Sequence, residues 1–185
     1  HNFMKNECFL PPGEDASCPY FWPIGNRYIF LFFSHTTGSQ YLLGDYNKEE
    51  HCFYPTFHGR FNFMSFLPGG VHAPSATSDG KGGVIVIHNM HTGKKSPGWR
   101  GITTLPRKLT LDKCDTINIQ PYGDYKSLRT HHQHIDKTHL PANKEIIIDN
   151  IQGNALEIKA EINIKSSPMI EMNVLRSPDK EEFTS

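Results

Sequence analysis

Residues 28–46 read YIFLFFSHTTGSQYLLGDY, two aromatic and aliphatic runs separated by a short polar segment. The first run, Tyr28–Ser34, and the second, Gln40–Tyr46, each have the composition of a short strand. Residues 36–39 (TTGS) supply the turn between them, and residues 25–26 (GN) mark another turn just upstream. The stretch therefore predicts an antiparallel β-hairpin.

Outward from this hairpin, short strands and turns continue. Residues 79–83 read DGKGG and precede the apolar run Val84–Met90, which predicts a turn followed by a strand. DGKGG is not a phosphate-binding loop, because it lacks the Gly-Lys-Ser/Thr ending and no helix is expected after it. The segment Ile102–Leu111 carries Pro106, which limits it to an edge strand, a bulge or two shorter pieces. Together these signals predict an all-β protein.

The pattern changes after residue 121. Residues 124–129 suit one or two helical turns, and residues 130–141 read as a histidine-rich connector. From residue 145 strands are expected again, and residues 156–165 alternate strictly between apolar and polar side chains, as in a half-buried antiparallel strand. We therefore expect one domain over residues 1–121, a short helix and linker over 122–141, and a second domain over 142–185.

Composition excludes several classes of function. Lys plus Arg and Asp plus Glu number 19 each, so nothing electrostatic favours nucleic acid or an anionic membrane as a partner. The longest apolar runs are far shorter than the roughly 20 residues of a membrane helix. We expect a soluble protein and consider a secreted or periplasmic location. Four cysteines without CxxC spacing favour buried free thiols over a zinc site, with disulfides as the alternative: Cys8, Cys18, Cys52 and Cys114.

Several segments resemble, in order and spacing, the second half of glycoside hydrolase family 32 enzymes. Ser17–Gly25 (SCPYFWPIG) is similar to the family's Glu-Cys-Pro-Asp segment, and Gly98–Leu111 (GWRGITTLPRKLTL) is similar to the Gly-Trp…Leu-Pro-Arg segment that closes its propeller. Shorter matches are Tyr41–Tyr46, His72–Pro74, Ser127–Arg129 and Val174–Phe183. The resemblance implies the late blades of a five-bladed β-propeller over 1–121 and the start of a C-terminal β-sandwich over 142–185.

For function, the resemblance implies retaining hydrolysis or transfer of fructosyl groups from sucrose or fructans. Such chemistry needs two carboxyl groups about 5 Å apart, a nucleophile and a general acid. The family's nucleophile and its Arg-Asp-Pro motif belong to early blades, and neither motif occurs in this sequence. We therefore expect this chain to be inactive alone and to need missing propeller blades or a partner chain. The final residues look like a strand that stops, which also predicts a longer protein.

Ser17 occupies the position of the family's catalytic acid, and a serine hydroxyl does not protonate a leaving alkoxide at neutral pH. Two neighbouring carboxyl groups, Asp15 and Glu14, are the candidate acids if the strand begins with a bulge. Asp15 is preferred, because it lies two residues before Ser17 and faces the same side of a regular strand. A third candidate is Glu7, in the dipeptide Glu7-Cys8. The competing interpretation is that Glu14 and Asp15 are solvated loop charges.

Three side chains are candidates for substrate binding: His72, His88 and Trp99. Histidine and tryptophan rings stack on sugar faces, although a lone histidine is more often a structural residue. Trp22 is expected in the core, and Arg107 in an internal ion pair. The cluster His131, His132, His134 and His139 has no accompanying ligand motif, so we expect no metal and no cofactor. The alternative to an enzyme is a non-catalytic carbohydrate-binding or remnant propeller–sandwich protein.

Overall fold

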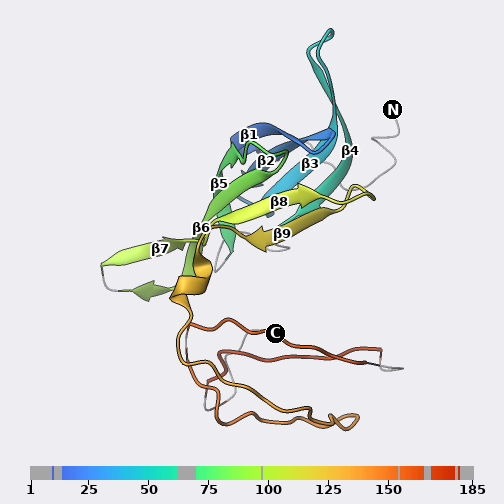
Figure 1. The fold of residues 1–185 in the computed structure, drawn as a ribbon. Coiled ribbons are helices and arrows are strands. Elements are labelled where there is room, and N and C mark those ends of the chain that lie inside the picture. The colour runs from blue at the N-terminus through green and yellow to red at the C-terminus, as the bar shows by residue number, and fades with distance from the viewer. Residues whose placement is uncertain are drawn as a thin grey trace. The chain divides into compact units, whose positions relative to one another are not determined.

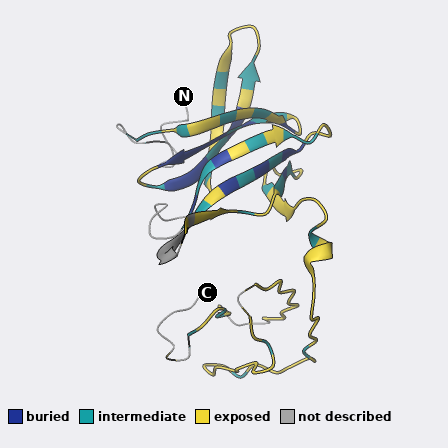
Figure 2. Cartoon of the chain, turned by 90° about the vertical axis from the view of Figure 1, so that its left-hand side faces the viewer, coloured by how far each residue is buried: buried dark blue, intermediate teal, exposed yellow. Residues whose placement is uncertain are grey.

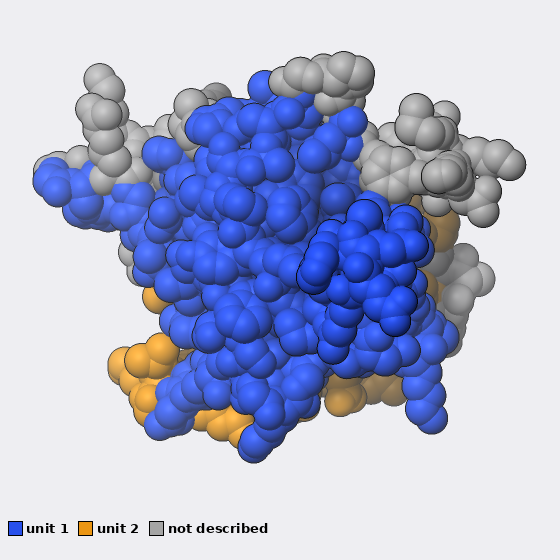
Figure 3. Space-filling model, turned by 90° about the horizontal axis from the view of Figure 1, so that it is seen from above, with its two compact units in different colours: residues 1–125 blue, residues 126–185 orange. Residues whose placement is uncertain are grey.

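The computed structural model describes residues 10, 14–61, 70–96, 98–153, 155–164, 168–177 and 179. The chain forms two compact units, residues 1–125 and 126–185, which Figure 3 colours separately. Every regular element of more than one turn in the described residues is a β-strand, and every strand pairing is antiparallel. The all-β prediction is therefore confirmed. No helix in the described ranges has the length and apolar character needed to cross a membrane.

The first sheet of unit 1 is a simple meander in which each strand pairs with the next (Figure 1). Its strands are β1 (Ser17–Ile24), β2 (Arg27–Ser34), β3 (Gly38–Asn47) and β4 (Cys52–Arg60). The hairpin predicted from residues 28–46 is confirmed, because β2 and β3 pair in continuous register from Tyr28–Gly44 to Ser34–Gly38.

The second sheet is also antiparallel but has five strands. Its path is β5 (Val71–Ser78), β6 (Val84–Ser96), β8 (Arg107–Leu111) and β9 (Ile117–Pro121), while β7 (Trp99–Thr103) pairs with the distal part of β6. Pro106 falls between β7 and β8, so of the three alternatives for this segment the structure shows the two shorter pieces. The DGKGG turn joins β5 to β6, and Asp79 closes it by accepting hydrogen bonds of 2.7 Å from both the Lys81 and the Gly83 amide.

The core of unit 1 lies between the two sheets, as the dark-blue segments of Figure 2 show. Both sheets contribute fully buried aliphatic side chains: Ile24, Ile29, Leu31, Leu43, Val84, Val86 and Leu109. Trp22 packs against this cluster, and its indole N–H donates to the carbonyl oxygen of Ala76 at 3.2 Å, joining β1 to β5. The core placement predicted for Trp22 is therefore confirmed. Two antiparallel sheets, of four and five strands, thus pack face to face, as neighbouring blades of a propeller do.

The linker turn and unit 2 contain less regular structure. Residues Tyr125–Leu128 form a single 3-10 turn (η2), which confirms the helical turn expected there. The alternating residues 155–164 form no ladder with any described residue, and Ile158 and Ile162 are each 49 % exposed. An amphipathic strand needs a neighbouring strand to hydrogen-bond its backbone and a packing surface to bury its apolar face. The alternation of residue types specifies neither of these partners. The β-sandwich over residues 142–185 stays a prediction.

The cysteines correct another expectation. Cys18, Cys52 and Cys114 are free and exposed, whereas their sequence context predicts buried thiols. Cys18 and Cys114 lie outside the regular pairing, and Cys52 is the first paired residue of its strand. Cys18 is the extra residue in a bulge of β1, Cys52 opens β4 after a turn, and Cys114 lies in the turn between β8 and β9. Cys8 lies outside the described residues.

Candidate functional site

Both sheets begin with the same irregularity. In β1 the pairing passes from Ser17–Phe33 to Tyr20–Leu31, so one extra residue is inserted in β1. In β5 it passes from His72–Asn89 to Pro74–His88, again with one extra residue. β-bulges redirect side chains and are common beside active sites. The bulge on which the acid hypothesis depends is therefore present, and Ser17 and His72 occupy equivalent positions just before the two bulges.

Asp15 lies just before the first bulge and accepts three hydrogen bonds. The Ser17 hydroxyl donates to Oδ2 at 2.6 Å, the His35 amide donates to Oδ1 at 3.0 Å, and the His35 ring Nδ1 lies 2.7 Å from Oδ2. The hydrogen bonds from Ser17 and then His35 lower the pKa of Asp15 to about 2. A general acid needs a raised pKa, so in this arrangement Asp15 is a hydrogen-bond acceptor and not a proton donor.

Glu14 has different partners on the same turn. Its carboxylate accepts hydrogen bonds from the hydroxyls of Ser34, Thr36 and Thr37, the last two at 2.7 and 3.3 Å. Desolvation raises the pKa of Glu14, but these three hydrogen bonds outweigh it and lower the pKa below its ordinary value. Glu14 therefore ties the segment before β1 to the turn between β2 and β3. Neither candidate acid is an uncommitted loop charge. Glu7 lies outside the described residues.

The network around Glu14 continues into the sheet. Thr37 accepts a hydrogen bond of 2.6 Å from the Gln40 side-chain amide, and the Gln40 carbonyl oxygen lies 2.6 Å from His58 Nε2. Desolvation, with a smaller contribution from the Arg60 charge, lowers the pKa of His58 to about 4. A neutral ring with its proton on Nε2 satisfies this contact, so His58 anchors the amide and is not a titrating surface group near pH 7.

His72 is brought toward the Asp15 site through aromatic contacts. The Phe33 ring lies 4.7 Å from the His35 ring and 5.7 Å from the His72 ring, measured between centroids. His72 in turn stacks on His91 at 4.6 Å with an interplanar angle of 11°. Desolvation lowers the pKa of His72, helped by the charges of His91 and His35 and opposed by a hydrogen bond with the Gly70 backbone. The predicted residues Asp15, Ser17 and His72 thus share one neighbourhood.

His88 and Trp99 lie elsewhere. His88 is 1 % exposed, packs 5.0 Å from the Phe61 ring, and neither of its ring nitrogens has a hydrogen-bond partner in the described structure. Desolvation, then the charges of Arg107 and His72, lowers the pKa of His88 to about 4. A buried ring does not reach a sugar, so His88 is a core residue in this structure. Trp99 is half exposed near the tip of the β6–β7 hairpin, which Figure 1 shows extending past the other strands.

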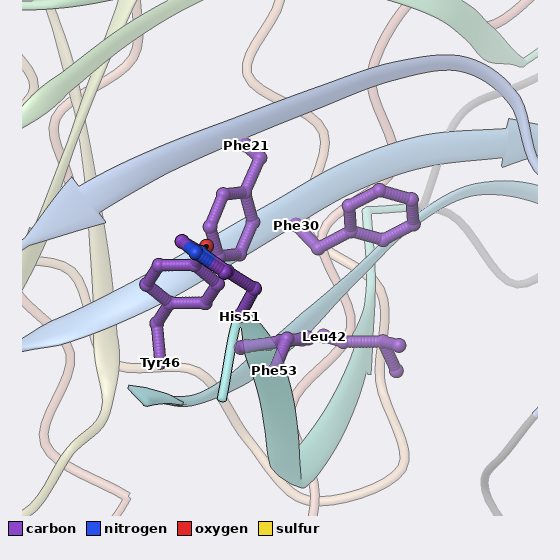
Figure 4. Close-up of a pocket in the computed structure, with 6 residues that line it drawn as sticks. All are labelled: Phe21, Phe30, Leu42, Tyr46, His51 and Phe53. Atoms are coloured by element: carbon purple, nitrogen blue, oxygen red, sulfur yellow. Dashed lines mark hydrogen bonds between the residues drawn. The ribbon is translucent and has the colours of Figure 1, made fainter. Parts of the chain in front are cut away.

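Sequence reasoning missed two features. The first is His35, which follows β2 directly and whose pairing with Asp15 spans 20 positions. The second is a shallow hollow of about 350 Å³ on the face of the first sheet opposite the core. Its lining is mainly aromatic (Figure 4): Phe21, Phe30, Leu42, Tyr46, His51 and Phe53. The alternation of aromatic with core aliphatic side chains along β2 is the signal that both faces of this sheet are apolar.

The histidines of the linker form no metal centre in the described residues. No group of three or more His, Cys, Asp or Glu side chains in those ranges is placed to hold a metal ion. His134 lies 3.5 Å from Asp136, and both side chains are largely exposed.

Fold and site together define an all-β protein with two bulged antiparallel sheets and a polar site at their bulged strand starts. No family model matches the chain, and no curated protein matches it. Among solved structures, it is similar to a glycoside hydrolase family 32 protein from Bifidobacterium adolescentis, at a TM-score of 0.42 and 15 % sequence identity. The match covers 60 % of this chain and 19 % of that structure, so the chain spans about a fifth of its length. The similarity is distant and says nothing about substrate or mechanism.

Proposed function

We propose that this chain supplies part of the substrate site of a glycoside hydrolase family 32-like protein that acts on fructosyl bonds of sucrose or fructans. The observation that carries the proposal is the pair of matching bulges. Ser17, at the position of the family's catalytic acid, and His72, at the family's Tyr-Ala-Pro position, each lie just before one of these bulges, and Asp15 contacts His35, whose ring is linked to His72 through Phe33. This arrangement supports the proposal. The Ser-Cys-Pro and Leu-Pro-Arg segments that resemble the family support the same conclusion.

The reaction would be a retaining double displacement, with the nucleophilic carboxylate outside this chain. A site built from a carboxylate, imidazoles and an aromatic ring suits a furanoside, which carries many hydroxyl groups. Carboxylate and imidazole groups accept and donate hydrogen bonds to sugar hydroxyls, and the Phe33 and His72 rings offer apolar faces. By itself the chain would bind weakly and would not cleave.

Binding without hydrolysis is the second candidate, and one observation favours it. The hydrogen bonds that Asp15 accepts from Ser17 and His35 hold its pKa at about 2, so this carboxyl group is ionised at neutral pH. Ser17 stands at the family's acid position, and Asp15, the preferred candidate acid, is ionised. Neither group donates a proton to a leaving group, which favours a protein that binds sugar without cleaving it.

The test uses the complete protein that contains this chain. Hydrolysis is followed on sucrose, inulin and levan by release of fructose, and binding of the same sugars is followed by calorimetric titration. We expect binding that weakens at least ten-fold in His72→Ala and stays unchanged in the control His51→Ala, which alters the aromatic hollow instead. Binding sensitive to His51 but not to His72 would move the sugar site to that hollow. Absence of both binding and hydrolysis would refute the proposed function.

A further inference from the structure

His35 is held by the two oxygens of a single carboxylate. Its backbone N–H donates to Asp15 Oδ1 at 3.0 Å, and its ring Nδ1 lies 2.7 Å from Asp15 Oδ2. Two contacts from one residue to one carboxylate fix both the position of the backbone and the rotation of the imidazole. The Ser17 hydroxyl donates to the same Oδ2 at 2.6 Å and so fixes the carboxylate itself. We call these three residues the clamp. Asp15 lies in the segment before β1, Ser17 is the first residue of β1, and His35 follows β2 directly.

The clamp also decides which ring nitrogen carries the proton. A carboxylate facing Nδ1 accepts a hydrogen bond only if Nδ1 carries hydrogen, so the neutral tautomer is the Nδ1–H form and acid–base exchange takes place at Nε2. A second contact also orients the imidazole: the Phe33 ring lies 4.7 Å from it, between centroids, at an interplanar angle of 53°. Despite these contacts the His35 side chain is 60 % exposed, whereas His58 and His88 are 7 % and 1 % exposed. His35 is thus both oriented and open to solvent.

We propose that His35, oriented by Asp15, is the group that donates the proton to the leaving oxygen of the fructoside, in place of the carboxylic acid that Ser17 replaces. The proposal rests on the proposed function and names the acid of that site. Asp15 acts through His35 and is a positioning residue, while His35 is the catalytic residue.

The proposed reaction proceeds in two displacements. A carboxylate supplied from outside this chain attacks the anomeric carbon as its bond to the glycosidic oxygen breaks. The bonding pair goes to that oxygen, which takes the proton from Nε2 of the His35 imidazolium. Water then attacks the fructosyl–enzyme ester, its proton returns to Nε2 of the neutral His35, and the carboxylate leaves. Asp15 stays ionised throughout and stabilises the imidazolium.

The charged and titratable groups around His35 are consistent with this role. Asp15 contacts the ring directly, and Glu14 binds Ser34 and Thr36 on the same turn. His72 approaches from β5 through Phe33, and His91 of β6 stacks on His72. The ionisable groups around His35 therefore come from three parts of the fold: the segment before β1, β5 and β6.

The experiment compares two substrates on the complete protein and its His35→Gln, Asp15→Asn and His51→Gln variants. Sucrose has a poor leaving group that needs a proton, whereas p-nitrophenyl β-fructofuranoside has a leaving group that departs without one. We expect His35→Gln to lower kcat on sucrose by about 10²- to 10⁴-fold and to change kcat on the aryl substrate by less than about 10-fold. The control His51→Gln, an exposed histidine of the same sheet, should behave like wild type on both.

Asp15 is tested separately, because it is expected to act through the ring. In histidine-selective ¹⁵N spectra of the complete protein, the Nδ1–H tautomer of His35 should dominate in wild type and give way to Nε2–H in Asp15→Asn. kcat on sucrose should fall in that variant by less than in His35→Gln. If Asp15→Asn does not fold, Ser17→Ala, which removes one hydrogen bond to the same carboxylate, takes its place and should show the same shift to a smaller extent.

The outcomes separate this inference from the proposed function. Hydrolysis of sucrose by wild type with an equal loss on both substrates in His35→Gln, or with no loss, overturns the role of His35 and leaves the function standing. Binding of fructosides without hydrolysis overturns the inference and selects the binding protein. Loss of both binding and hydrolysis overturns both.

Discussion

Cys18 and Ala73 occupy the same place in two different sheets. Each is the extra residue of a bulge in the first strand, each has a positive φ (51° and 43°), and each is followed directly by a proline. Positive φ is uncommon for residues other than glycine, and a proline restricts the preceding residue further. The repeat of this costly geometry in both sheets indicates that the bulges are maintained features of the fold.

Glycine at either bulge should therefore stabilise the protein. We expect Cys18→Gly and Ala73→Gly each to raise the free energy of unfolding by up to about 1 kcal/mol, because glycine has no Cβ to oppose positive φ. The matched control is Ala76→Gly in the same strand β5, where φ is not positive, and it should lower stability by about 0.5–1 kcal/mol. Urea unfolding measures all three. A loss of stability in both bulge variants would show that the positive φ is not strained.

Asp15 should contribute to stability only above a defined pH. Its folded pKa of about 2 lies below its ordinary 3.8, so its stabilising effect is complete above about pH 4 and is lost as pH falls toward 2. The side chain is 40 % exposed, so we expect a contribution below about 1 kcal/mol. Asp15→Asn should therefore unfold at a lower temperature than wild type at pH 6 and at nearly the same temperature at pH 2. Asp136→Asn, at a fully exposed carboxylate, is the control and should match wild type at both pH values.

His88 should destabilise the protein as pH falls through a higher window. Its folded pKa of about 4 lies below the ordinary 6.5, so the unfolded chain binds a proton first and stability falls between pH 6.5 and 4. His88→Leu removes a buried ring without hydrogen-bond partners in the described structure and should raise stability at pH 7 by about 1–3 kcal/mol.

The pH dependence provides a second readout for this variant. Between pH 6.5 and 4, stability of His88→Leu should fall less steeply than that of wild type by up to about 1.4 kcal/mol per pH unit. His58, also lowered to about 4, keeps its own share of the slope. His134→Leu, at an exposed ring, should leave the slope unchanged. An unchanged slope in His88→Leu would mean that His88 titrates normally in the folded protein.

Arg27 should matter more than an ordinary surface arginine. Its guanidinium pairs with Asp45 at 2.8 Å and with Asp115, and it donates to Thr56 at 2.6 Å, so it joins the first sheet to the turn between β8 and β9. Lysine cannot reproduce this fork, and Arg27→Lys should lower stability by about 1–2 kcal/mol. Arg60→Lys, at an exposed arginine, is the control. A double-mutant cycle with Asp115→Asn should give a coupling energy different from zero; additive effects would refute the link.

Local patterns predicted local structure. The Tyr28–Tyr46 hairpin and the break at Pro106 follow from residue types within a few positions, and both were predicted from the sequence. The alternation over residues 156–165 predicted a strand that is unpaired in the described structure, because alternation describes the faces of a strand and not its neighbour. The Cys18 thiol was expected inside, yet it projects from a bulge that the pattern of the strand does not reveal.

The candidate site was predicted only in part. Asp15 and His72 were proposed from motif positions, and the structure places them in one neighbourhood. The lowered pKa of Asp15 depends first on the neighbouring Ser17 and then on His35, which no local pattern connects to Asp15. His88 was proposed as a substrate-binding residue, but the packing of the second sheet on the first buries it. Contacts between residues far apart in the sequence bring His35 to Asp15 and bury His88.

The hydrogen bond from Trp22 to Ala76 places a natural fluorophore at the seam between the two sheets. Trp99, the other tryptophan of the sequence, is half exposed on the β6–β7 hairpin. Trp99→Phe would therefore leave an emission spectrum that reports on the inter-sheet seam alone. Separation of the sheets would then appear as a red shift, even where the strands of each sheet keep their pairing and circular dichroism stays constant.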